Sequence, residues 1–186
     1  MMIPYLIVVT GEPGAGKTTF AIALAGEACL PLICRDQIKE GCVHTWERSS
    51  LPVPEDANLI ATKLFFQVIT QMLEGGCSLI AEAAFQHKLW SPYLEPLMET
   101  ARIRICLCAP DTREIAHERF LQRGLSDSRR IRFHNDFGVE LARQGKIPVF
   151  TEYDPPHLNV PTYRINTTGE YDPPLSTLIP LLMDDP

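Results

Sequence analysis

The chain has 186 residues, of which 45% are hydrophobic and 22% are charged. This length and composition are typical of one globular domain, which we expect over residues 1–186, and they exclude a disordered or collagen-like chain. The 17 Lys and Arg residues and the 23 Asp and Glu residues give a formal net charge of −6. A protein that binds long nucleic acid needs a basic face, so this charge argues against that class.

The N-terminal segment and the cysteines favour a cytoplasmic protein with no membrane partner. The N-terminal apolar run is too short for a membrane span and lacks the basic region and cleavage site of a signal peptide. The six cysteines are irregularly spaced and form no Cys-x-x-Cys pair, which disfavours a zinc site. Several cysteines fall in apolar runs, so we expect small buried hydrophobic residues in a reducing compartment.

Strands and helices alternate along the chain. In chain order, the apolar and β-branched runs predict strands at residues 5–10, 32–34, 78–83, 102–108 and 160–166. Helices are predicted at residues 18–28, 57–73, 111–122 and 174–182. Two more helices are predicted to start at residue 36 and after a cap at Ser91-Pro92. We expect the helix at 111–122 to end near Gly124, and Asp172 and Pro173 to start the last helix. Such alternation implies right-handed βαβ units, hence a parallel sheet with helices on both faces in a three-layer α/β/α fold.

A phosphate-binding loop is the most specific motif of the sequence. Gly-Glu-Pro-Gly-Ala-Gly-Lys-Thr-Thr at residues 11–19 fits the pattern G-x-x-x-x-G-K-[ST] between a predicted strand and a predicted helix. The glycines let backbone N–H groups converge on phosphate, Lys17 adds a positive charge, and the Thr18 hydroxyl suits Mg²⁺. The motif predicts ATP and Mg²⁺ as ligands and a P-loop nucleoside-triphosphate hydrolase fold with a five-stranded parallel sheet. The predicted nucleotide-binding residues of the motif are Gly11, Glu12, Pro13, Gly14, Ala15, Gly16, Lys17, Thr18 and Thr19.

The rest of the sequence favours a small kinase among P-loop proteins. No Asn-Lys-x-Asp motif for guanine occurs, and the chain is too short for a ring ATPase with a helical lid domain. Asp36 follows the second predicted strand, which we expect next to the P-loop strand, so its carboxylate can face the γ-phosphate from the acceptor side. There it can take the proton of an acceptor hydroxyl and hold that hydroxyl in line. A helix N-cap and a water-mediated magnesium ligand are the alternatives for Asp36.

The P-loop together with Arg35-Asp36-x-x-Lys39 resembles the polynucleotide 5′-kinase-like group of P-loop kinases. This group includes the phage polynucleotide kinase, zeta toxins and chloramphenicol phosphotransferase, and the resemblance covers residues 5–45, 78–90 and 102–130. It implies transfer of a phosphoryl group from ATP to a hydroxyl, with Asp36 as the base and with Arg35 and Lys39 on the acceptor side. Lys39 replaces an arginine of the phage-type motif, which keeps the charge but loses the bidentate fork and weakens the case for a 5′-terminal phosphate.

The same resemblance assigns two arginines and a glutamate. Arg119 and Arg123 share one helix face, and the resemblance implies that they lead into a lid over the phosphates at about residues 119–135. Arg123 is expected to stabilise charge that grows on the transferred group. Glu82 is expected to hold a magnesium-bound water or an acceptor hydroxyl, with a buried structural role as the alternative. Nearby arginines that fit either an anion site or a solvated face are Arg129, Arg130 and Arg132.

The acceptor itself is the least defined part of the prediction. In this architecture the expected pocket residues are His44, Trp46, Phe85, Gln86, His87 and Trp90, although single aromatic residues more often pack than bind. The segment 166–169 lies where such kinases contact adenine. We expect an ATP- and Mg²⁺-dependent kinase that acts on a hydroxyl of a small molecule or nucleotide-like acceptor, with Lys17, Asp36 and Arg123 as catalytic residues. The alternatives are a polynucleotide or RNA 5′-hydroxyl kinase and a regulatory ATP-binding module without an acceptor.

Overall fold

Five strands form one parallel sheet in the order β2-β3-β1-β4-β5, which confirms the predicted fold class. The computed structural model describes residues 3–127, 133–134, 137–146, 148 and 150–184. Each of the five predicted strands is present within two residues of its expected limits. The strands are β1 (Tyr5–Thr10), β2 (Leu32–Cys34), β3 (Leu79–Glu82), β4 (Arg102–Ala109) and β5 (Thr162–Asn166).

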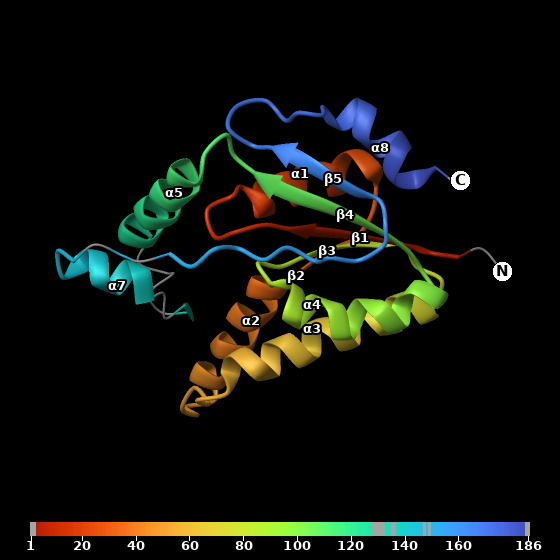
Figure 1. Cartoon of the computed structure of the whole chain (residues 1–186). Coiled ribbons are helices and arrows are strands. Elements are labelled where there is room, and N and C mark those ends of the chain that lie inside the picture. Colours follow the sequence, from red (N-terminus) through yellow and green to blue (C-terminus); the bar gives the residue numbers. More distant parts are fainter. Residues whose placement is uncertain (1–2, 128–132, 135–136, 147, 149, 185–186) are drawn as a thin grey trace.

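Helices cover both faces of this sheet, as Figure 1 shows. Helices α1 and α8 lie on one face, and α3 and α4 lie on the other, which is the expected three-layer arrangement. Helices α5 and α7 lie beyond the carboxyl ends of the strands. The helices are α1 (Lys17–Ala28), α2 (Arg35–Arg48), α3 (Ala57–Glu74), α4 (His87–Leu94), the 3₁₀ turn η1 (Glu95–Glu99), α5 (Arg113–Ser126), α7 (Phe137–Arg143) and α8 (Leu175–Met183).

The central strand β1 divides the hydrophobic core into two halves. Leu6 and Val8 face the core that contains residues of α3 and α4, whereas Ile7 and Val9 face the core that contains residues of α1 and α8. All four side chains are fully buried. Burial on both faces explains why these four consecutive positions are apolar instead of alternating with polar residues.

The strand order brings three separate segments to one edge of the sheet. Val9 of β1 pairs with Glu82 of β3, and Glu82 pairs in turn with Cys34 of β2. Strand β3 therefore lies between β1 and β2, so the expectation that the second strand neighbours the P-loop strand was wrong. Because all strands run the same way, the P-loop, the start of α2 and Glu82 still meet at the carboxyl edge, where open parallel sheets bind ligands.

Of the two helix limits expected in the middle of the chain, one is present and one is not. Helix α5 ends at Ser126, near Gly124 as expected, and Gly124 also serves close packing: a Cβ there would lie 2.3 Å from Cγ2 of Val139 in α7. Pro92 lies inside α4, which begins at His87, so the pair Ser91-Pro92 does not cap that helix.

The start of the last helix also differs from the expectation. Helix α8 begins at Leu175, after Asp172 and Pro173. The backbone of Asp172 is engaged in an antiparallel bridge to Asn166, with N···O distances of 2.8 and 3.3 Å. These hydrogen bonds hold Asp172 beside the end of β5, which leaves the helix to begin further along the chain.

The cysteines are all free, and their burial is only partly as expected. Cys34, Cys106 and Cys108 are buried, whereas Cys29 is exposed at the end of α1. The expectation of buried cysteines was therefore wrong for Cys29. Across the part of the chain that the structure describes, no helix is both long and apolar enough to cross a membrane.

Candidate nucleotide and acceptor site

A cavity of about 640 Å³ opens at the carboxyl edge of the sheet. Its walls come from the P-loop with the start of α1, the first turns of α2, the start of α3, the end of β3, and the face of α5. Twelve of the predicted site residues line this cavity: Pro13, Gly14, Gly16, Lys17, Thr18, Thr19, Arg35, Asp36, Lys39, Glu82, Arg119 and Arg123. Gly11, Glu12 and Ala15 belong to the same loop but are not part of the lining.

The P-loop packs tightly against α5. Gly14 and Gly16 have φ angles of 84° and 77°, which glycine adopts readily and other residues rarely do. A Cβ at Gly14 would lie 1.8 Å from the backbone oxygen of Ala116 in α5. Glycine at position 14 is therefore required both by the turn of the loop and by the close approach of the helix.

Lys17 lies buried on the loop. Its ammonium Nζ donates a hydrogen bond to the backbone oxygen of Glu12 at 2.9 Å. Burial lowers the pKa of Lys17, and the nearby carboxylate of Glu82 acts in the opposite direction. The Glu12 carbonyl thus holds the Lys17 ammonium over the loop, where backbone N–H groups and the N-terminus of α1 attract phosphate.

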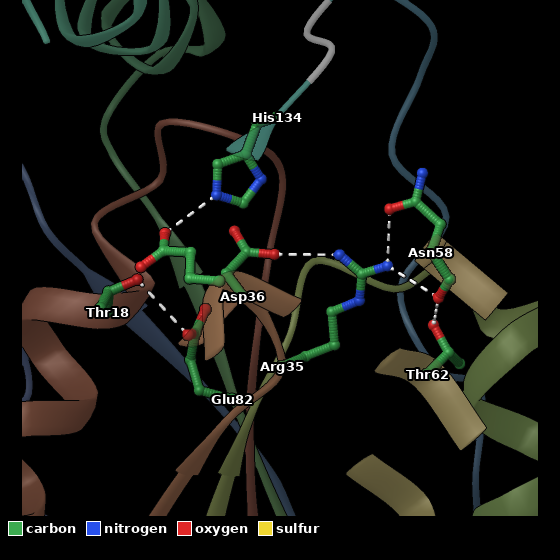
Figure 2. Close-up of polar contacts among 8 residues, drawn as sticks. Thr18, Arg35, Asp36, Asn58, Thr62, Glu82 and His134 are labelled. Carbon is green, nitrogen blue, oxygen red and sulfur yellow. Dashed lines mark hydrogen bonds and ion pairs between the residues drawn. The ribbon is translucent and has the colours of Figure 1, made fainter. Parts of the chain in front are cut away.

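Glu82 lies beside Thr18 at the floor of the cavity. The Thr18 hydroxyl donates to Glu82 Oε2 at 3.4 Å, and Glu82 is only 5% exposed (Figure 2). Burial raises the pKa of Glu82, while Lys17 lowers it. Burial also raises the pKa of the Cys34 thiol to about 12, so this thiol is neutral and donates to Glu82.

These oxygen atoms fit a magnesium ion that is bound mainly by phosphate and water. A hydroxyl and a carboxylate are ligand types that Mg²⁺ accepts, and Mg²⁺ usually keeps several waters. Among the described residues, no group of three or more His, Cys, Asp and Glu side chains could hold a metal ion by itself. The donor set at Thr18 and Glu82 therefore suits an ion that arrives with a nucleotide.

Asp36 lies in the first turn of α2, facing the same cavity. Its side chain is 52% exposed, and Arg35 Nη1 donates to Asp36 Oδ1 at 3.2 Å. The N-cap position of α2 belongs to Cys34 and has no side-chain cap, so the alternative that Asp36 is the N-cap is wrong. Asp36 lines the cavity together with Lys17 and Thr18 of the opposite wall.

Three residues that the sequence did not single out complete this side of the cavity. Asn58 of α3 accepts hydrogen bonds from Arg35, and Glu40 of α2 contacts His134 with Oε1 and Nε2 3.0 Å apart (Figure 2). Glu40 follows Asp36 by four residues, so its place on the same helix face was a usable signal. Asn58 and His134 come from distant segments, and no local motif marks them.

Arg119 and Arg123 extend from α5 over the other side of the cavity. Arg119 donates from Nη1 and Nη2 to the backbone oxygens of Thr167 and Thr168, both at 3.0 Å. The Thr167 hydroxyl donates to the backbone oxygen of Ala15 at 3.0 Å. The segment 166–169 therefore lies against the P-loop, and Arg119 holds it there. The remaining arginines of the expected lid, Arg129, Arg130 and Arg132, lie outside the described residues.

The six residues expected to line the acceptor pocket do not contribute to this cavity. Trp90 is fully buried among the aromatic rings of Phe65, Phe66 and Phe85, and its indole Nε1 donates to Thr10 at 3.0 Å. His87 Nδ1 accepts from the backbone N–H of His157 at 3.1 Å. For Phe85, Trp90 and His87 the expectation was wrong, because these side chains pack in the core or make a loop contact. The other residues of this set are His44, Trp46 and Gln86.

The sheet, the P-loop after β1 and the cavity at the strand ends define a P-loop protein of the kinase-like type. The model of the Zeta toxin family matches residues 2–138, so the chain belongs to the Zeta toxin family. This confirms the resemblance to the group of P-loop kinases that includes zeta toxins. A search of curated proteins gives no match.

Solved structures support the fold over the whole chain. A candidate kinase from Chloroflexus aurantiacus is 24% identical, with a TM-score of 0.71 and coverage of 98% of this chain and 95% of that chain. The APS kinase of Mycobacterium tuberculosis, in complex with AMPPNP and APS, is 16% identical, with a TM-score of 0.60 and coverage of 99% and 100%. A gluconokinase from Sinorhizobium meliloti is 15% identical, with a TM-score of 0.53 and coverage of 98% and 91%.

Proposed function

We propose that the protein is an ATP- and Mg²⁺-dependent phosphotransferase that acts on a hydroxyl of a small polar molecule. One observation carries this proposal: the P-loop and the Asp36 carboxylate line the same cavity, although they come from different strands. A kinase needs a phosphate site and a group that orients the acceptor hydroxyl opposite each other. A protein that only binds ATP has no use for the second group.

The roles follow from the chemistry of each side chain. Lys17 and the backbone N–H groups of the P-loop hold the β- and γ-phosphates. Thr18 and Glu82 would hold a magnesium ion, which would neutralise phosphate charge. The acceptor hydroxyl gives its proton to Asp36, and its oxygen forms the new bond to the γ-phosphorus. The bond from that phosphorus to the β,γ-bridging oxygen breaks, and ADP leaves. Arg123 stabilises the charge on the transferred group.

The lining of the cavity supports a hydrophilic acceptor. The lining residues that α2 and α3 contribute are all polar: Arg35, Asp36, Gln37, Lys39, Glu40 and Asn58. These side chains offer hydrogen bonds and charge to an acceptor, whereas the aromatic rings that line the cavity, those of Phe120 and His134, come from other segments. A compact polyhydroxyl compound fits this wall best. The gluconokinase among the structural neighbours agrees with this class of acceptor.

A turnover assay with acceptor candidates tests the proposal. Purified protein is given MgATP with sugars, sugar acids, nucleosides, aryl alcohols and 5′-hydroxyl oligonucleotides, and transfer of label from [γ-³²P]ATP is followed. We expect transfer to a polyhydroxyl compound that is lost in Asp36→Asn. Acceleration by 5′-hydroxyl oligonucleotides alone would favour a polynucleotide kinase. ATP binding with no transfer to any compound would favour a regulatory module.

A further inference from the structure

The guanidinium of Arg35 is held between α2 and α3 (Figure 2). Its Nη2 donates to both the backbone oxygen and the side-chain Oδ1 of Asn58, at 3.0 and 2.9 Å. Its Nη1 donates to Asp36 Oδ1 at 3.2 Å. The guanidinium carbon also lies 6.0 Å from the ring centroid of Phe85. Contacts on two edges and one face fix the orientation of this planar group.

This arrangement differs from that of an arginine that binds a ligand. The Arg35 side chain is only 12% exposed, whereas the Asp36 side chain that it contacts is 52% exposed. Arg35 is therefore the less exposed of the two side chains and Asp36 the more exposed one. Because Arg35 engages one oxygen of the Asp36 carboxylate, the rotation of that carboxylate is restricted, and its second oxygen has a defined direction.

Asn58 lies where it can hold Arg35 in this orientation. The backbone oxygen of Asn58 also accepts a hydrogen bond from the Thr62 hydroxyl at 2.8 Å, within the first turns of α3. Asn58 thus presents two oxygens to one nitrogen of Arg35 from a regular, packed helix. Helix positions set side chains more accurately than loops do, and small misplacements in a reacting site have large effects on rate.

We propose that Asn58 is a positioning residue of the phosphotransferase site, and that it acts by holding Arg35 so that Arg35 orients the Asp36 carboxylate toward the acceptor. Arg35 is then a positioning residue as well, and it need not contact the acceptor. This inference rests on the proposed function, because it requires that Asp36 orients or deprotonates the group that attacks the γ-phosphate.

Five variants, one of them a double variant, test the proposal with MgATP as the probe and water as the acceptor, and again with the hydroxyl compound that the acceptor assay selects. Asn58→Ala removes the side-chain oxygen, and Asn58→Asp keeps an oxygen for Arg35. Lys63→Ala is the matched control, since Lys63 is exposed on the same helix and is not part of the cavity. Asp36→Asn, alone and combined with Asn58→Ala, completes a double-mutant cycle.

The inference predicts a specific pattern of kinetic constants. Asn58→Ala should lower kcat on the order of tenfold and leave the KM for ATP within about twofold. Asn58→Asp should keep most of the turnover, and Lys63→Ala should equal the parent. In the Asp36→Asn background, Asn58→Ala should cause no further loss. Asn58 is exposed, so these variants are expected to fold, and their melting temperatures are compared with that of the parent.

Each remaining outcome identifies what has failed. If Asn58→Ala equals the parent while Asp36→Asn is inactive, the positioning role is wrong and the proposed function stands. If Asn58→Ala causes a further loss in the Asp36→Asn background, or mainly raises the KM for the acceptor, Asn58 acts independently of Asp36 and the inference is overturned. If Asp36→Asn equals the parent, the proposed function itself has failed.

Discussion

The carboxylate of Glu12 in the P-loop lies 3.2 Å from Arg113 Nε in the first turn of α5, measured at Oε2. The same oxygen lies 3.4 Å from His117 Nε2, one turn further along the helix. The His117 ring stacks on Phe150 with the ring centroids 3.8 Å apart, and Arg113 Nη2 donates to the backbone oxygen of Thr151 at 2.8 Å. Glu12 therefore connects the phosphate-binding loop to the helix that carries Arg119 and Arg123.

Loss of this connection should reduce catalysis more than nucleotide binding. In Glu12→Ala the backbone oxygen that holds Lys17 remains, so we expect the dissociation constant for ATP to change by less than about threefold. Because α5 loses an attachment to the loop, kcat should fall by roughly three- to tenfold. Calorimetry and steady-state kinetics measure the two effects. A loss of ATP affinity with an unchanged kcat would show that Glu12 serves binding only.

Arg123 should contribute to turnover far more than to affinity. It lines the cavity one helical turn beyond Arg119, whose guanidinium is engaged by the backbone of Thr167 and Thr168. Arg123→Ala should lower kcat by roughly a hundredfold or more and change ATP affinity little, because charge on the transferred group grows in the transition state. An unchanged kcat in this variant would remove Arg123 from the mechanism.

The burial of Glu82 should make stability depend on pH. Because burial raises its pKa, the folded state binds the proton more tightly than the unfolded chain. The resulting stabilisation is complete below the ordinary carboxyl range and is lost as the pH rises through the raised pKa. The side chain of the Glu82→Gln variant cannot lose a proton. The melting temperature of this variant should therefore rise relative to that of the parent between about pH 4 and about pH 8. A difference that stays constant or decreases would contradict the raised pKa.

Tyr153 should contribute to stability through buried hydrogen bonds. Its hydroxyl lies 2.6 Å from Thr10 Oγ1 and donates to the backbone oxygen of Phe85 at 2.8 Å, which attaches a distant loop to the end of β1. Tyr153→Phe should lower the free energy of unfolding by about 1–3 kcal/mol, because buried polar atoms lose their partner. Tyr163→Phe, which removes an exposed bond to Leu181, is the control and should cost less. Equal losses in chemical denaturation would count against a special role for Tyr153.

The sequence predicted those features that depend on contiguous residues. Strand β1 is apolar from Leu6 to Val9 because both of its faces are buried there, and this pattern is visible without any tertiary information. The P-loop is equally local, since its glycines, Lys17 and Thr18 follow one another. Asp36 lines the same cavity as the P-loop even though β3, and not β1, is the neighbour of β2.

The features that failed depend on contacts between distant segments. Phe85 and Trp90 follow Glu82 closely, but their rings turn into the core with Phe65 and Phe66 instead of toward the acceptor. Asn58 reaches the site only because α3 packs beside α2. No spacing in the sequence reports such a meeting, so positioning residues of this kind become visible only in the folded chain.

Binding of a non-hydrolysable ATP analogue to the parent protein and to Lys17→Ala is the most direct test of the central claim. Isothermal titration calorimetry with Mg²⁺ present should give one site per chain in the parent, with a rise in the melting temperature at saturation. Lys17→Ala should bind at least about a hundredfold more weakly, while the surface variant Lys63→Ala should bind like the parent. Absence of binding to the parent, or undiminished binding to Lys17→Ala, would contradict a P-loop that holds the nucleotide phosphates.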